Sequence, residues 1–137
     1  MKRLAVLLGA LLLGACGGPA AQVAGNYSGQ SSILISNNAG ENQNASEFVT
    51  VTQSGGEIDF NVASCAMKAF SDSTSTFHVQ STKCTRTLNT ASWVLNITDG
   101  TVNGSSNNFS MTAKGTATSG SQTGDLTFTF SGTKSNF

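Results

Sequence analysis

The sequence predicts an all-β domain, an antiparallel up-and-down barrel of about eight strands. Only 10% of the residues are charged, and long helix-favouring side chains are scarce, whereas Thr, Val, Ile and Phe suit a pleated surface. Apolar and polar residues alternate with a period of two in many stretches, which is typical of strands with one buried face. The single proline, Pro19, lies outside all of these stretches, so it interrupts no strand.

The predicted strands of the first half are separated by polar turns. Ser54-Gly55-Gly56 supplies the positive φ that a tight hairpin needs, so the flanking strands are expected to pair. The polar run Asn37–Asn44 is expected to form a loop and is a candidate contact surface for another protein. These strands are residues 27–35, 47–53, 57–62 and 65–70.

The second half adds the remaining strands. A turn is expected at Ser71-Asp72-Ser73, Asp99-Gly100 is expected to stop the sixth strand, and residues 119–124 form the last turn. The strands are residues 77–79, 93–97, 109–114 and 125–131. Short turns at roughly ten-residue spacing favour a barrel, because closure removes exposed sheet edges. A two-sheet β-sandwich is the alternative.

Aromatic side chains recur along the predicted strands and have two interpretations. A small barrel fills its interior with side chains, so a packed core is the favoured one. The other is a cavity for a small apolar ligand, which would need several hundred Å³. The residues are Phe48, Phe60, Phe70, Phe77, Trp93, Phe109, Phe128 and Phe130.

The first sixteen residues have the composition of an export signal. The cationic start Lys2-Arg3 precedes an apolar run from Leu4 to Leu13. That run is too short to cross about 30 Å of hydrocarbon as a helix, which is typical of a signal peptide. The following Leu13-Gly14-Ala15-Cys16 resembles the lipobox of bacterial lipoproteins. The resemblance implies that residues 1–15 are removed and that Cys16 carries the lipid as the new N-terminus.

The same resemblance implies a location and a division of the chain. Several acyl chains hold a protein to a membrane far more firmly than one. Gly17, rather than Asp, follows the cysteine, and similarity to lipoprotein sorting in Gram-negative bacteria implies the outer membrane, at its periplasmic face or the cell surface. Residues 16–23 are expected to form a short tether, and residues 24–137 a single barrel domain.

Cys65 and Cys84 remain once Cys16 is lipidated. In an exported protein an even pair predicts a disulfide, and its loop of about twenty residues would stabilise the domain by ~3 kcal/mol. A metal site or reactive thiol is the alternative. The chain has no C-x-x-C motif and His78 is its only histidine, so neither a metal nor a cofactor is predicted.

Three segments together resemble the calycin-like barrels of small bacterial lipoproteins. They are Ala24–Gly29 at the start of the domain, Val51–Gly56 at the first hairpin and Gly124–Phe130 at its end. The resemblance implies a barrel over most of the mature chain. Tyr27 stands where the lipocalin signature Gly-x-Trp has its Trp, a departure from small-molecule carriers of that type.

Composition and motifs argue against several function classes. The chain beyond residue 15 has five lysines and arginines against seven acidic residues, 5 − 7 = −2, which disfavours nucleic-acid binding. No G-x-S-x-G or phosphate-binding loop is present. His78 is expected on a polar strand face. Glu57 and Asp59 share an outward face, and a glycosidase role would need a raised pKa there. No enzymatic activity is predicted.

The leading hypothesis is therefore a membrane-anchored lipoprotein that acts as a non-enzymatic binding or envelope-associated module. Its partners would be the membrane, through Cys16, and a small apolar ligand or a protein. One alternative is an inhibitor of lysozymes or other hydrolases. Ser54-Gly55 resembles the start of the Ser-Gly-x-x-Tyr motif of lysozyme inhibitors, but Ile58 stands at the position of the tyrosine. The other alternative is a purely structural component of the envelope.

Overall fold

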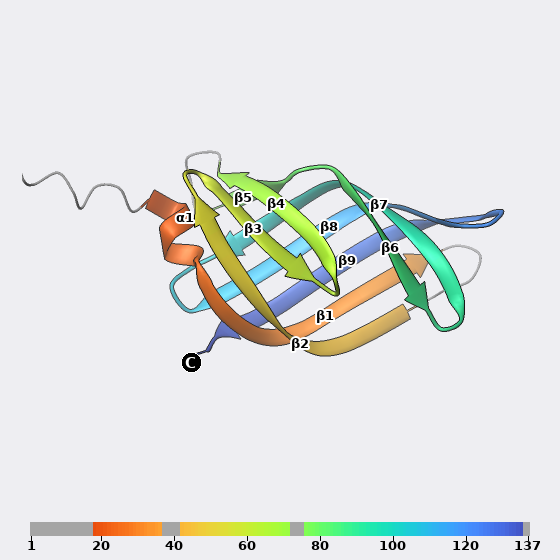
Figure 1. Cartoon of the computed structure of the whole chain (residues 1–137), viewed down its shortest axis with the longest axis horizontal. Coiled ribbons are helices and arrows are strands. Elements are labelled where there is room, and N and C mark those ends of the chain that lie inside the picture. Colours follow the sequence, from red (N-terminus) through yellow and green to blue (C-terminus); the bar gives the residue numbers. More distant parts are fainter. Residues whose placement is uncertain (1–17, 37–41, 72–75, 136–137) are drawn as a thin grey trace, which may run out of the picture.

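The computed structural model describes residues 18–36, 42–71 and 76–135. The leader, Cys16, residues 37–41 of the predicted loop and residues 72–73 of the predicted turn lie outside these residues. The rest of the predicted loop was wrong, because residues 42–44 begin the strand Asn42–Ser54. The described strands form one antiparallel sheet that closes into an eight-stranded barrel with one further strand outside it (Figure 1). The predicted all-β barrel is confirmed, and the sandwich is not formed. The elements are α1 (Gly18–Val23), β1 (Gly25–Ser36), β2 (Asn42–Ser54), β3 (Glu57–Val62), β4 (Cys65–Ser71), β5 (Thr76–Val79), β6 (Thr82–Leu88), β7 (Ala91–Gly104), β8 (Asn108–Ser119) and β9 (Gln122–Lys134).

Neighbouring strands in the sequence are mostly neighbours in the sheet. The order is β5-β4-β3-β2-β1-β9-β8-β7-β6, and pairing of β5 with β7 closes the barrel. β5 and β6 follow the same edge of β7 in one register, since His78 lies opposite Thr101 and Thr82 lies opposite Ile97. β4 pairs with β5 but not with β6. β6 therefore continues along β7 without pairing with β4, and the wall of the barrel is split between β4 and β6.

Two strand predictions were wrong. Residues 82–88, for which no strand was predicted, form β6. Its inward positions include Cys84 and Arg86 instead of a row of apolar residues, so the usual alternation is absent. Asp99-Gly100 does not stop β7, which runs on to Gly104. The pairing with β8 shifts between Ile97 and Asp99, as at a β-bulge, where an extra residue bends a strand without ending it.

The alternating apolar residues fill the interior, as predicted. Phe60, Trp93, Phe109, Phe128 and Phe130 are all buried. The ring of Phe109 lies 5.3 Å from those of Tyr27 and Phe60 and 6.1 Å from that of Phe130, between centroids. This part of the interior is a packed core of rings.

Phe48 and Phe70 are the exceptions among the aromatic residues assigned to the core or a cavity. Phe48 is 68% exposed. Val49 and Val51 take the inward positions of β2, and because side chains alternate along a strand, Phe48 points outward. Phe70 on β4 is also exposed, at 44%. Neither side chain can line the interior.

The segment expected to be a tether is helical from Gly18. Ala20 and Val23 of α1 are buried, and Val23 packs so closely over Gly104 that a Cβ at that glycine would lie 2.7 Å from Val23 Cγ2. The Tyr27 hydroxyl donates a hydrogen bond of 2.6 Å to the Val23 carbonyl. Helix α1 is therefore part of the domain and covers one end of the barrel (Figure 1).

Candidate functional site

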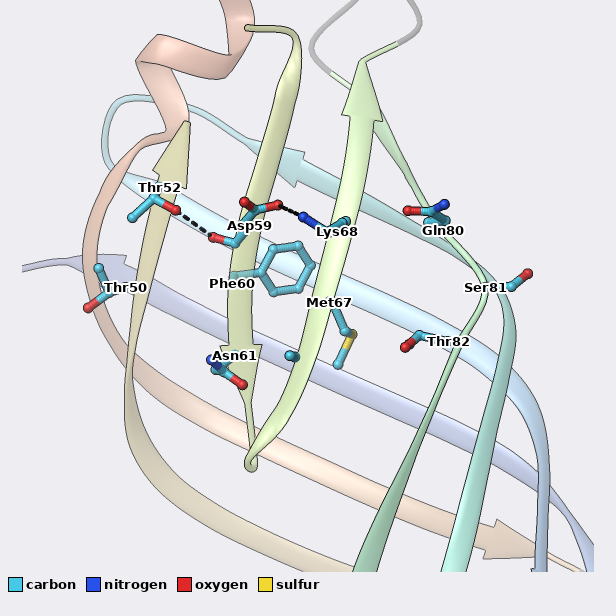
Figure 2. Close-up of a pocket in the computed structure, with 11 residues that line it drawn as sticks. Thr50, Thr52, Asp59, Phe60, Asn61, Met67, Lys68, Gln80, Ser81 and Thr82 are labelled. Atoms are coloured by element: carbon cyan, nitrogen blue, oxygen red, sulfur yellow. Dashed lines mark hydrogen bonds and ion pairs between the residues drawn. The ribbon is translucent and has the colours of Figure 1, made fainter. Parts of the chain in front are cut away.

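A groove follows the split in the barrel wall. It has a volume of about 690 Å³ and lies over β2, β3, β4 and the segment that joins β5 to β6 (Figure 2). Phe60 and Met67 come from the buried face, and the other side chains are mostly hydroxyls, amides and charged groups. The lining residues are Thr50, Thr52, Asp59, Phe60, Asn61, Ala66, Met67, Lys68, Gln80, Ser81 and Thr82.

The charged groups of the groove form a small ion-pair network. Lys68 Nζ lies 3.0 Å from Glu57 Oε2 and 3.2 Å from Asp59 Oδ1. A side-chain hydrogen bond with Glu57, together with the hydrogen bond and positive charge of Lys68, lowers the pKa of Asp59 below its usual value. The same carboxylates raise the pKa of Lys68. A general acid needs a raised carboxyl pKa, whereas the pKa of Asp59 is lowered.

The disulfide crosses the split at one end of the groove. Cys65 begins β4 and Cys84 lies on β6, with their Cα atoms 5.6 Å apart. The predicted pairing is confirmed. Because β4 and β6 share no strand pairing, this covalent link holds the two sides of the split together.

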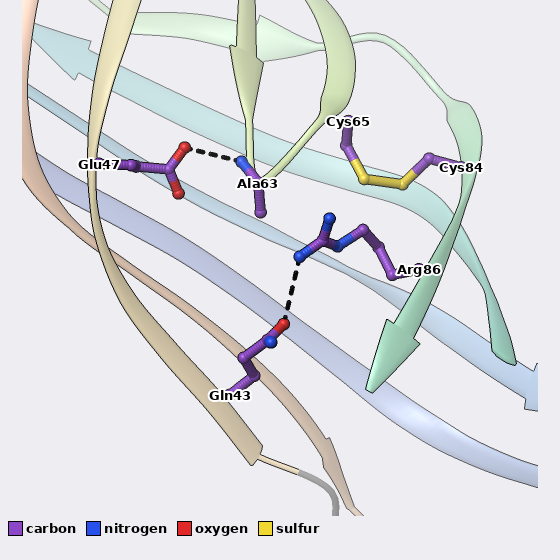
Figure 3. Close-up of a disulfide and its surroundings, with 6 residues drawn as sticks. All are labelled: Gln43, Glu47, Ala63, Cys65, Cys84 and Arg86. Atoms are coloured by element: carbon purple, nitrogen blue, oxygen red, sulfur yellow. Dashed lines mark hydrogen bonds between the residues drawn. A yellow bond between two sulfur atoms is a disulfide. The ribbon is translucent and has the colours of Figure 1, made fainter. Parts of the chain in front are cut away.

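Four residues that make hydrogen bonds lie beside the disulfide, and we call this set the mouth. It consists of Gln43, Glu47, Ala63 and Arg86 beside the Cys65–Cys84 bond (Figure 3). Arg86 Nη2 donates a hydrogen bond of 3.3 Å to Gln43 Oε1. Ala63 N donates one of 2.9 Å to Glu47 Oε1. The first contact joins β6 to β2, and the second joins the β3–β4 turn to β2.

Within the part of the chain that the structure describes, two polar atoms near the mouth are buried without a hydrogen-bond partner. They are Arg86 Nε and Trp93 Nε1. Arg86 lies directly opposite Trp93 in the pairing of β6 with β7. Buried donors are nearly always paired in folded proteins, and each exception calls for an explanation.

At the opposite end of the barrel, beside α1, the polar groups of Tyr27 and Lys134 are paired. Lys134 Nζ donates a hydrogen bond of 3.1 Å to the Ala24 carbonyl and lies 5.6 Å from the centre of the Tyr27 ring. Burial raises the pKa of the Tyr27 phenol. This end therefore offers a covered surface, in contrast to the mouth.

The structure brings together residues that the sequence analysis treated separately or overlooked. Glu57 and Asp59 were expected to face water, and they do so beside Lys68. His78 is exposed on β5, as expected. Arg86 was not identified as a site residue. The signal available was that it is the only arginine after Arg3 and lies two residues from Cys84, on the same strand face.

Other site types receive no support within the described part of the chain. There, no three His, Cys, Asp or Glu side chains gather closely enough to hold a metal ion. Residues 18–36, 42–71 and 76–135 include no helix that is long and apolar enough to span a membrane. Comparison with known protein families, with curated proteins and with solved structures finds no match to this chain.

Proposed function

We propose that this chain is a lipid-anchored protein of the bacterial cell envelope, whose barrel acts as a non-enzymatic binding module. The observation that carries the proposal is the distance in sequence between the lipobox and the fold. Gly17 alone separates Cys16 from Gly18, where α1 begins and packs onto the barrel. The acceptor cysteine thus stands at the point where the folded domain starts.

This spacing gives the anchored domain an orientation. A residue extends the chain by at most about 3.6 Å, so a lipid on Cys16 would hold Gly18 within about 7 Å of the Cys16 backbone. The α1 end of the barrel would then lie against the membrane. The mouth lies toward the other end of the barrel (Figure 1), so it would face away from the lipid and be accessible to a ligand.

The groove and the mouth support the binding role. The groove is a concave surface of about 690 Å³, and at the mouth a guanidinium group is held by a neutral amide. Pockets with a few convergent polar groups are typical of ligand sites. The packed rings of the interior support a ligand at the split wall rather than inside the barrel.

Metabolic labelling tests the anchor. The full-length chain is produced in a Gram-negative host supplied with labelled palmitate, beside the Cys16→Ser variant and a Cys84→Ser variant as a matched control. We expect label in the wild-type and Cys84→Ser proteins, none in Cys16→Ser, and extraction of labelled protein only with detergent. Recovery of the wild-type protein without detergent, with a free thiol at position 16, would contradict the proposal.

A further inference from the structure

We propose that the mouth binds a small monocarboxylate, with Arg86 as the residue that pairs with its charge. This inference names a ligand class for the binding role proposed above and rests on that role. It does not depend on the lipid anchor.

The first observation is the incomplete pairing of Arg86. Among the described residues, its only hydrogen-bond partner is the neutral side chain of Gln43. Lys68 makes both ion pairs found within the described chain, so no carboxylate in residues 18–36, 42–71 or 76–135 neutralises Arg86. Arg86 is also partly buried. A guanidinium that has lost water without gaining an anion is costly, and a carboxylate would offset that cost.

The second observation is a pair of donors that lack acceptors. Arg86 Nε and Trp93 Nε1 are both buried and unpaired, and their residues are cross-strand neighbours. Directly opposed residues on one face of a sheet lie close enough for their side chains to interact. An acceptor group placed between them would satisfy both nitrogens, which a single apolar ligand could not do.

The charge and shape of the site favour a monocarboxylate. The planar guanidinium fork matches a carboxylate through two parallel hydrogen bonds. Arg86 supplies one positive charge, which neutralises one negative charge of a ligand. Glu47 belongs to the same mouth (Figure 3), so the second negative charge of a dianion such as sulfate would be repelled. The Glu47 carboxylate itself accepts a hydrogen bond from the Ala63 backbone amide.

Gln43 occupies the position that the ligand would take. Its amide oxygen lies 3.3 Å from Arg86 Nη2, a long contact between a charged donor and a neutral acceptor. Rotation of the Gln43 side chain would free the guanidinium, and Gln43, the second residue of β2, is only partly buried. The amide therefore acts as a weak competitor for the carboxylate.

Trp93 supplies a direct readout, because it is the only tryptophan in the chain. Protein purified from the full-length chain in a non-ionic detergent is titrated with acetate, butyrate and hexanoate at constant ionic strength. We expect a saturable change in tryptophan emission with the carboxylates, and an affinity for sulfate and chloride about tenfold or more weaker. No saturable change, or equal responses to sulfate and carboxylate, would overturn the inference.

Variants locate the site. Arg86→Gln should weaken carboxylate binding about tenfold or more. Lys83→Gln, on the outer face of the same strand, should leave binding unchanged. Gln43→Glu places a carboxylate of the chain itself beside Arg86, and we expect it to abolish binding and to raise the melting temperature by a few degrees. Equal binding loss in Lys83→Gln, or undiminished binding in Gln43→Glu, would contradict the assignment.

The Cys16→Ser protein separates this inference from the anchor. If that variant binds carboxylate as wild type does, the mouth is a carboxylate site whatever the state of Cys16. If the wild-type protein is labelled by palmitate but shows no carboxylate response, the anchor proposal stands and the ligand assignment fails.

Discussion

The two ends of the barrel differ in what holds them together and in whether their buried polar groups are hydrogen-bonded. At the α1 end, a cluster of rings around Phe109 is sealed by the helix, and the Tyr27 hydroxyl is bonded to Val23. At the mouth, the wall is held by a disulfide, and the buried nitrogens of Arg86 and Trp93 lack acceptors. The closed end has the features of a stable core, whereas the unmet hydrogen bonds of the mouth cost stability, and such departures from the packing rules are expected mainly at functional or strained sites.

The largest effect should come from the ring cluster. Phe109→Ala removes a fully buried ring and should lower the free energy of unfolding by about 3–5 kcal/mol. Phe48→Ala is the matched control, because Phe48 is 68% exposed and its loss should change stability by less than about 0.5 kcal/mol. Urea denaturation measures both. Equal effects would mean that the two phenylalanines do not differ in burial.

The disulfide should rank second. Replacing Cys65 and Cys84 together by Ala should lower the free energy of unfolding by ~3 kcal/mol, because the bond closes a loop of 19 residues in the unfolded chain. The loss should be accompanied by greater hydrogen exchange in β6 than in β8, since β6 pairs only with β7. Uniform exchange in both strands would show that the bond does not specifically hold the split wall.

The seal at the α1 end gives a smaller effect. Tyr27→Phe removes the hydroxyl that bonds the Val23 carbonyl and leaves that acceptor unpaired, at a cost of about 1–3 kcal/mol. Thermal unfolding measures it. Proteolysis should then cut first within α1 rather than in the β strands. An unchanged melting temperature would indicate that α1 is held by Ala20 and Val23 alone.

The smallest effect belongs to the exposed ion pairs of Lys68. Because the pKa of Asp59 is lowered in the folded protein, the stability it contributes is present above its unfolded pKa and is lost as the pH falls through the folded value. The pKa of Lys68 is raised, so its contribution is lost only when strong alkali deprotonates it. Lys68→Met should flatten the acid limb of the stability profile slightly, and an unaltered limb would contradict this.

Strand periodicity was sufficient where one face of a strand meets the core. Phe60, Trp93, Phe109, Phe128 and Phe130 were predicted to be inward and are buried. The prediction for Phe48 was wrong, because Val49 and Val51 occupy the inward face of β2 and alternation leaves Phe48 on the outer face.

The sequence by itself determined the strands with clear alternation, the cysteine pair and the lipobox resemblance, because each depends on residue types at short spacings. Only the tertiary structure decided where the wall splits, that β6 lies outside the barrel and that Arg86 faces Gln43. The first two features depend on which strands pair with one another. The third is a contact between β2 and β6, some forty residues apart, and such a contact leaves no periodic signal in the sequence.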